Sequence, residues 1–410
     1  MTTADSNHVH TRQIMTNPPH TKKPHRQRAT ELVHSGRNPK GQHGFVNPPV
    51  YRGSTILFSD METLETGKQA YTYGRKGSPS MDALQDALTG LEGGHRTFLT
   101  SSGLSAVTTG LLSFVKSGDH ILVVDTCYRP TRQFCDDVLT GLGVTTTYYD
   151  PLTGSGIAAL FQPNTRLVYT ESPGSQTFEM QDIPAISAAA RAREIWVLMD
   201  NTWSSQCFFK PFEHGVDVAI HAGTKYVVGH ADALLGIITC NERAAPVVQK
   251  GHWALGGCAG SEEIYLGTRG LRTMEVRLMR HQASGIEMAQ WLQQRPEIEA
   301  VLHPALPDFP GHALWKRDHT GATGLFAVVL KPPVAKRQVA AMLDGLSLFG
   351  MGYSWGGYES LVVPFDPANY RSATKSAYAG RHCLRLHIGL EDVGDLKADL
   401  EAGFARLRAA

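Results

Sequence analysis

The 410-residue sequence has no long run of apolar residues and almost no net charge. Its longest apolar runs, Ile195 to Met199 and Gly324 to Leu330, fall far short of the roughly 20 residues that a helix needs to cross a bilayer. The 39 basic residues nearly balance the 38 acidic residues, so the chain has no general attraction to nucleic acid or to a membrane surface. These absences exclude a transmembrane helix and favour an enzyme that acts on small molecules.

Cysteine and histidine are not arranged as metal ligands. The six cysteines are scattered, without a C-x-x-C pair or a spacing typical of zinc sites. The 18 histidines form no H-E-x-x-H motif or similar tight pattern. The sequence therefore predicts no metal site and a chain that resides in the reducing cytoplasm.

The N-terminal segment is polar and basic. Its first thirty residues contain five lysines and arginines against the single acid Asp5, with several prolines and no apolar signal segment. We expect a disordered tail of about thirty residues. An organellar transit peptide and an anion-binding arm are the alternatives.

Length and periodicity predict two domains after an N-terminal arm of residues 1–77. From Thr97 onward, short apolar runs alternate with helical stretches, which is typical of a mainly parallel sheet covered by helices. This α/β domain should span residues 78–271, with strands at 97–100, 120–125, 144–149, 167–171, 195–200, 216–221 and 235–240. A smaller α+β domain, residues 272–410, should hold strands near 301 and at 324–330, 346–351 and 383–388, then a final helix over 392–407.

The strongest chemical signal is Lys225, which follows an apolar strand in Ala222-Gly223-Thr224-Lys225-Tyr226. A lysine amine condenses with aldehydes, and withdrawal from water lowers its pKa enough to let it attack. A solvated loop lysine is the alternative. Asp200 ends another apolar strand, where a carboxylate can pair with a cationic ring nitrogen or simply cap the next helix.

Two further features suit a phosphorylated cofactor. Thr100 to Ala106 opens an apolar helical stretch, so its backbone N–H groups can bind a phosphate, although the same residues would serve as an ordinary helix cap. Tyr128 follows the strand that ends at Asp125, where its ring can stack on a cofactor or pack between a helix and a strand.

In order and spacing, the chain after Thr30 resembles the cystathionine and methionine metabolism group of pyridoxal-phosphate enzymes of fold type I, whose fold is that of aspartate aminotransferase. The segments that carry the resemblance are 73–79 (YGRKGSP), 91–94 (LEGG), 171–174 (ESPG), 200–203 (DNTW) and 224–226 (TKY). The resemblance implies pyridoxal 5'-phosphate as cofactor, and a homo-oligomer, expected as a tetramer with a dimer as the alternative.

The resemblance also implies roles for individual residues. Lys225 would hold the cofactor as a Schiff base and move the substrate α-proton, and Asp200 would pair with the pyridine nitrogen. The backbone N–H groups of Gly103 and Leu104 would bind the phosphate, and Thr202 and Thr224 would add hydroxyl contacts to the cofactor. Tyr128 would stack on the ring, and Tyr73 and Arg75 would come from a neighbouring subunit. Ala222 departs from the family, since many members have a serine there as an added phosphate ligand. The missing serine hydroxyl should weaken cofactor retention by about 1 kcal/mol.

For the substrate, the resemblance implies that the planar fork of Arg385 grips the α-carboxylate. A structural ion pair is the alternative for this arginine. Ser354, Trp355, Tyr73 and Tyr128 would line the same pocket, and Tyr128 would share the proton transfers with Lys225.

Segments 352–361 and 384–391 are most similar to those of the bacterial β-lyases of this family, with the pair Ser354-Trp355 as the discriminating detail. The resemblance thus implies β-elimination of L-cystathionine to homocysteine, pyruvate and ammonia, with other cysteine S-conjugates as further substrates. A methionine γ-lyase, a cystathionine γ-synthase and a non-catalytic regulatory relative are the alternatives.

Overall fold

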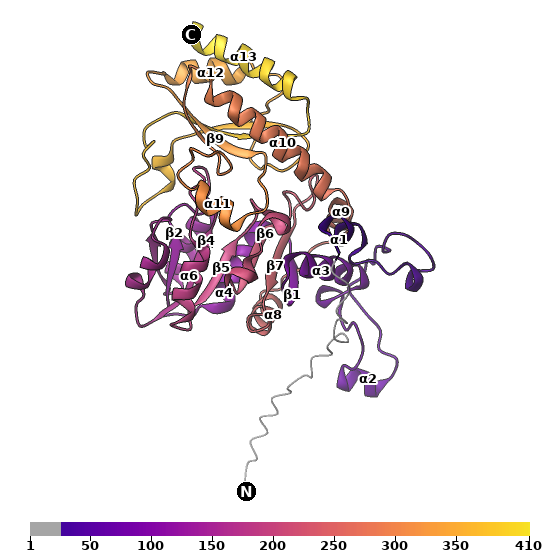
Figure 1. The fold of residues 1–410 in the computed structure, drawn as a ribbon. Coiled ribbons are helices and arrows are strands. Elements are labelled where there is room, and N and C mark those ends of the chain that lie inside the picture. Colours follow the sequence, from indigo (N-terminus) through magenta and orange to yellow (C-terminus); the bar gives the residue numbers. More distant parts are fainter. Residues whose placement is uncertain (1–25) are drawn as a thin grey trace.

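A computed structural model describes residues 26–410 (Figure 1). The predicted disordered tail lies mostly outside these residues, but its last part is wrong, because helix α1 (Arg28–His34) starts within it. Leu32 of α1 is buried in the core, and Arg28 donates to the Glu275 carboxylate and to the Cys207 carbonyl. These contacts provide the tertiary packing that the polar sequence pattern does not reveal.

The larger sheet contains seven strands in the order β1-β7-β6-β5-β4-β2-β3. Strands β3, β2, β4, β5 and β6 are parallel to one another, whereas β7 is antiparallel to both β6 and β1. The strands are β1 (Arg96–Thr100), β2 (His120–Val124), β3 (Thr145–Tyr149), β4 (Thr165–Glu171), β5 (Trp196–Asp200), β6 (Val218–Ala222) and β7 (Gly236–Cys240). The predicted α/β fold with a mainly parallel sheet is confirmed.

Helices cover this sheet and connect its strands. Helix α4 packs on β6 and β7, and α6 packs on β4 and β5. The helices of this part of the chain are α3 (Pro79–Glu92), α4 (Gly103–Phe114), α5 (Arg129–Gln133), α6 (Ile183–Arg191), α7 (Ser205–Phe208), α8 (Ala245–Ala254) and α9 (Ser261–Leu271). The inner strands of this sheet are buried on both faces and are rich in apolar residues; all five residues of β2 are buried. The edge strand β3 is only partly buried and consists of threonines and tyrosines.

The smaller sheet is antiparallel, in the order β10-β11-β9-β8, and is reached through the long helix α10 (Met274–Gln293), as Figure 1 shows. Its strands are β8 (Ile298–Leu302), β9 (Leu325–Leu330), β10 (Leu361–Phe365) and β11 (Cys383–His387), accompanied by α11 (His312–Asp318), α12 (Lys336–Asp344) and α13 (Val393–Ala409).

The strand predicted at 346–351 is wrong, because this segment forms only an isolated bridge from Gly350 to Leu361. The Asp399 carboxylate accepts the backbone N–H groups of Ser347, Leu348 and Phe349, which a strand would use in its ladder. The fourth strand of the smaller sheet is instead β10, which pairs with β11.

An arm precedes the large sheet and carries helix α2 (Met61–Thr66), which projects from the rest of the chain in Figure 1. The arm exposes large apolar side chains, among them Phe45, Leu57, Met61 and Leu64. Within residues 26–410, no helix combines the length and the apolar character that crossing a membrane requires.

Candidate active site

A cavity of about 660 Å³ opens where the carboxyl ends of β4 and β5 meet the start of α4 and the smaller sheet. Crevices at this edge of a parallel sheet are the usual ligand sites of α/β proteins. The sequence-predicted residues that line the cavity are Gly103, Leu104, Tyr128, Asp200, Thr202, Thr224, Lys225, Ser354, Trp355 and Arg385. The structure therefore brings ten of the predicted site residues together.

Lys225 lies in the turn that follows β6, and its ammonium donates to Ser354 Oγ at 2.7 Å. The Nζ atom also lies 5.4 Å from the centre of the Trp355 ring. Burial, helped by the positive charge of Arg385 and opposed by Asp200, lowers the pKa of Lys225 to about 8. Near neutral pH an appreciable fraction of this lysine is therefore the neutral amine that attacks an aldehyde.

Asp200 is the last residue of β5, and Thr202 fixes its carboxylate. The Thr202 backbone N–H and hydroxyl both donate to Asp200 Oδ1, at 2.9 and 2.5 Å. The same hydroxyl accepts the backbone N–H of Ala222 at 2.9 Å, which ties β5 to the lysine turn. Burial raises the pKa of Asp200, while the Thr202 bonds and the charges of His221 and Lys225 oppose this rise.

The start of α4 offers backbone donors to an anion. Ser102 caps the helix, since its hydroxyl accepts the Ser105 N–H and its carbonyl accepts the Ala106 N–H. The N–H groups of Gly103 and Leu104 precede these bonds and point outward, as the first donors of a helix do. A Cβ at Gly103 would lie 2.5 Å from the Cβ of Ala222, so only glycine lets the helix start approach the lysine turn this closely.

Thr224 places a third polar group here. Its hydroxyl accepts the Leu235 N–H at 3.0 Å and donates to the Leu235 carbonyl at 3.4 Å, a long bond that an oxygen atom of a ligand could replace.

Arg385 is the central residue of β11 and is surrounded by protein. It donates to the Ser354 carbonyl at 3.2 Å, and burial lowers its pKa without removing its charge. Ser354 has a φ of 82°, in the left-handed region that residues with a side chain rarely adopt. This strained backbone turns the serine hydroxyl toward Lys225 and its carbonyl toward Arg385.

Glu171 is a cavity residue to which the sequence analysis assigned no role. It ends β4 beside Asp200, and its Oε2 accepts the backbone N–H of Tyr128 at 2.7 Å. Burial and the charge of Asp200 raise the pKa of Glu171 well above its ordinary value. A carboxylate that closes a buried strand was the signal that identified Asp200, and the same signal could have identified Glu171.

Tyr73 and Arg75 do not reach this cavity. Tyr73 is about half exposed, and Arg75 donates to the Trp253 carbonyl at 3.1 Å. Both lie at the short turn η2 (Gly74–Lys76) that ends the arm. Their predicted role is in the site of a neighbouring subunit, and it stays a prediction.

These residues fit pyridoxal phosphate. Free backbone donors at a helix start suit a phosphate, a buried carboxylate suits a protonated pyridine nitrogen, and a lysine with a lowered pKa suits an aldehyde. All three lie around one cavity, and Tyr128 adds a half-exposed aromatic ring to its wall.

Comparisons with known proteins agree with this arrangement. The family described as "Cys/Met metabolism PLP-dependent enzyme" matches residues 29–405. A protein of Rhizobium johnstonii is 50% identical over 93% of this chain and 96% of its own length. The cystathionine β-lyase of Escherichia coli is 43% identical over 92% of this chain and 98% of its own length.

Among solved structures, the cystathionine γ-lyase of Lactobacillus plantarum, complexed with L-serine, is 27% identical and has a TM-score of 0.86. The alignment covers 93% of this chain and 100% of that protein. The family match over nearly the whole chain and the identities of 43% and 50% establish the relationship. The chain belongs to the family of Cys/Met metabolism enzymes that depend on pyridoxal phosphate.

Proposed function

We propose that the protein is a cystathionine β-lyase, which cleaves L-cystathionine to homocysteine, pyruvate and ammonia and also accepts other cysteine S-conjugates. The observation that carries the proposal is the hydrogen bond of 2.7 Å from Lys225 Nζ to Ser354 Oγ, with the Trp355 ring 5.4 Å away. This hydrogen bond connects the reactive lysine to Ser354-Trp355, the pair of residues that resembles the β-lyases. The name of the Escherichia coli relative supports the same activity.

The cofactor is held by the residues described above. The backbone N–H groups of Gly103 and Leu104 and the Thr224 hydroxyl would bind the phosphate, and Asp200 would bind the pyridine nitrogen. Thr202 holds the Asp200 carboxylate in place through two hydrogen bonds. Pyridoxal phosphate, when bound, supplies the electron sink that accepts the electron pair left at Cα.

The protein orients the substrate and moves protons. Arg385 binds the α-carboxylate, and Lys225 removes the Cα proton once its amine is free. The Cβ–S bond then breaks, the sulfur takes a proton and leaves as homocysteine, and water hydrolyses the three-carbon fragment to pyruvate and ammonia. Tyr128 can supply the proton to sulfur, because burial and the charge of Asp200 raise its pKa and keep the hydroxyl protonated.

The proposal includes a homo-oligomer in which Tyr73 and Arg75 complete the site of a neighbouring subunit, and we take the tetramer as its form. The exposed apolar side chains of the arm support a protein interface there, since monomers rarely expose such groups together. We also propose the division into an arm (1–77), a cofactor domain (78–271) and a C-terminal domain (272–410). The two separate sheets support this division.

A cytoplasmic location is part of the same proposal. All six cysteines are unpaired, and five of them are buried. Free thiols of this kind are typical of proteins in a reducing compartment.

The test is the product profile of the purified protein with L-cystathionine, L-cystine and L-methionine. We expect pyruvate and homocysteine from L-cystathionine. Cysteine and 2-oxobutyrate as main products would identify a γ-lyase instead, and condensation with an activated homoserine would identify a γ-synthase. Replacing Lys225 with alanine should abolish the yellow colour of the bound cofactor and the activity together, whereas the matched surface variant Lys250→Ala should retain both. An unchanged colour in Lys225→Ala would contradict the role of this lysine.

A further inference from the structure

A second guanidinium, that of Arg129, lines the cavity that contains Arg385. Arg129 starts helix α5, and Gln133, one helical turn later, lines the same wall. Within the described part of the chain, Arg129 makes no ion pair and no side-chain hydrogen bond; its guanidinium carbon lies 5.7 Å from the centre of the Tyr370 ring. By contrast, Arg132 of the same helix pairs with Asp125 at 2.6 Å. Arg129 is therefore a cation available to a ligand.

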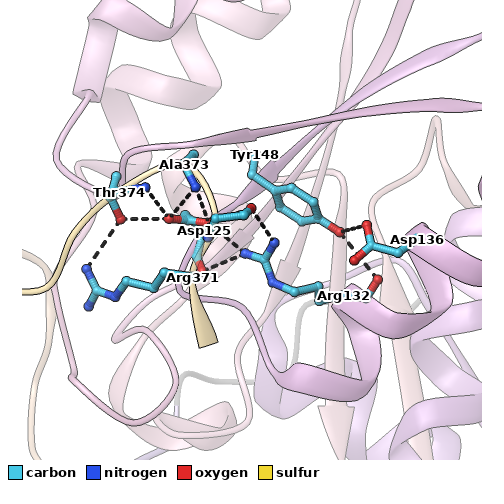
Figure 2. Close-up of polar contacts among 8 residues, drawn as sticks. Asp125, Arg132, Asp136, Tyr148, Arg371, Ala373 and Thr374 are labelled. Atoms are coloured by element: carbon cyan, nitrogen blue, oxygen red, sulfur yellow. Dashed lines mark hydrogen bonds and ion pairs between the residues drawn. The ribbon is translucent and has the colours of Figure 1, made fainter. Parts of the chain in front are cut away.

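Tyr370 reaches the cavity on a strap, by which we mean residues 366–381 between β10 and β11. The strap connects two strands of the smaller sheet, but it lies against the end of β2 in the larger sheet, where Asp125 binds it (Figure 2). The Asp125 carboxylate accepts the backbone N–H groups of Ser372, Ala373 and Thr374 at 2.7 to 3.2 Å, and the Thr374 hydroxyl at 2.6 Å.

These bonds fix the strap at the cavity. Burial favours the neutral form of Asp125, but the bonds from Ser372, Thr374 and Ala373 outweigh it and lower the pKa of this carboxyl group. Arg371, the neighbour of Tyr370, donates to Thr177 Oγ1 at 2.6 Å and to the Glu179 carboxylate. Tyr370 is thus positioned by two anchors that directly follow it in the chain, and its ring restricts the Arg129 side chain.

We propose that Arg129, positioned by Tyr370, binds the second carboxylate of the substrate, at the end remote from the scissile bond. This inference rests on the proposed function, because L-cystathionine carries one carboxylate at each end. Arg385 is buried beside Ser354 and Lys225 and takes the α-carboxylate, so the remaining anion needs a second cation on the same cavity. A guanidinium restricted by an aromatic ring loses little side-chain entropy when it forms a bidentate contact with a carboxylate.

The selectivity that follows is for cysteine S-conjugates whose sulfur substituent bears an acid. A substrate such as β-chloro-L-alanine has the same α-carboxylate and also yields pyruvate, but it has no distal anion. It therefore probes binding of the α-carboxylate and removal of the Cα proton without the contact to Arg129, and its chloride leaves without the proton that sulfur needs.

The experiment compares the holoenzymes of the wild type, Arg129→Gln, Arg129→Lys and the surface control Arg193→Gln, with pyruvate as the common readout. In Arg129→Gln, KM for L-cystathionine should rise by about tenfold to a hundredfold, the range for losing one charge-assisted hydrogen bond or a bidentate pair. The kcat for both substrates and the KM for β-chloro-L-alanine should stay within about twofold of the wild-type values. Arg129→Lys should lie between the wild type and Arg129→Gln, and Arg193→Gln should equal the wild type.

Equal losses on both substrates in Arg129→Gln would overturn the inference, because they would mean a general disturbance of the site. An unchanged KM for L-cystathionine would overturn it as well. Both results would leave the β-lyase function in place, since the wild type would still convert L-cystathionine to pyruvate. A wild type that makes pyruvate from β-chloro-L-alanine but not from L-cystathionine would overturn both.

Discussion

Glu171 and Asp200 end neighbouring parallel strands and lie directly opposite each other in the register of β4 and β5. Two carboxyl groups therefore face one cavity, and each raises the cost of charging the other. Asp200 is also supported by the Thr202 bonds and by the charges of His221 and Lys225, whereas Glu171 receives only the Tyr128 N–H. Folding therefore raises the pKa of Glu171 with little to oppose the rise, so Glu171 is the carboxyl group of this pair that keeps its proton to higher pH.

This difference predicts how Glu171→Gln changes stability with pH. A carboxyl group whose pKa is raised by folding binds its proton more tightly in the native state, so stability is lost as pH rises from the ordinary carboxyl range to the native pKa. Glutamine mimics the protonated form and avoids this loss. At pH 8 the Glu171→Gln apoprotein should unfold with a free energy higher by about 1 kcal/mol or more, the value of one pKa unit.

Denaturant unfolding of the apoprotein at pH 5 and pH 8 measures the effect, with the exposed Glu242→Gln as control. The gain should be smaller at pH 5, because this pH lies close to the ordinary glutamate pKa of about 4.3 and the unfolded carboxyl group begins to bind its proton as well. A gain that is independent of pH would mean that Glu171 is ionised in the native state.

The lowered pKa of Lys225 predicts the pH dependence of cofactor capture. Only the neutral amine attacks the aldehyde, and its pKa is about 8. The rate at which the apoprotein regains the absorbance of bound pyridoxal phosphate should therefore rise with pH through about 8 and then level off. Stopped-flow absorbance with excess cofactor measures this rate. A rise that continues to pH 10 would mean that the lysine keeps its ordinary pKa.

The contact between Gly103 and Ala222 predicts opposite effects for two single substitutions. Gly103→Ala would place a Cβ 2.5 Å from that of Ala222, which should cost about 1 to 3 kcal/mol of stability and weaken cofactor binding. Ala222→Ser should instead tighten binding by about fivefold, since one added hydrogen bond is worth about 1 kcal/mol. Equilibrium titration of each apoprotein with pyridoxal phosphate gives both values. Weaker binding by Ala222→Ser would show that the hydroxyl is directed away from the phosphate.

The sequence was sufficient to predict the parts of the site that follow apolar strands. Lys225 and Asp200 stand where buried strands end, so the strand pattern alone places them at one edge of the sheet. Ser354 lies 129 residues from Lys225 and reaches it only through tertiary packing, so family resemblance alone pointed to it. Tyr370 could not be predicted, because the strap follows no periodic pattern and is held by side chains far away in the sequence, such as Asp125 and Thr177. The same cause explains the misplaced strand at 346–351, where Asp399 takes the backbone donors.

A buried pair, Glu92 and His221, lies behind the site. Glu92 of α3 contacts His221 Nε2 at 2.7 Å and accepts from Asn201 Nδ2 at 3.1 Å. Asn201 follows Asp200, and His221 belongs to β6, which leads to Lys225. One carboxylate therefore fixes the ends of both strands that present the cofactor residues.

Glu92→Gln should therefore destabilise the protein by about 1 to 3 kcal/mol, the cost of leaving a buried hydrogen-bonding group without its partner. The matched control is Glu287→Gln, which breaks the exposed pair with Lys397 and should cost less than about 1 kcal/mol. Denaturant unfolding of both variants compares the two sites, and titration with pyridoxal phosphate should show weaker binding for Glu92→Gln alone. If Glu92→Gln were as stable as Glu287→Gln but still bound the cofactor poorly, Glu92 would act through the charge of His221 on Asp200 rather than through the strand ends.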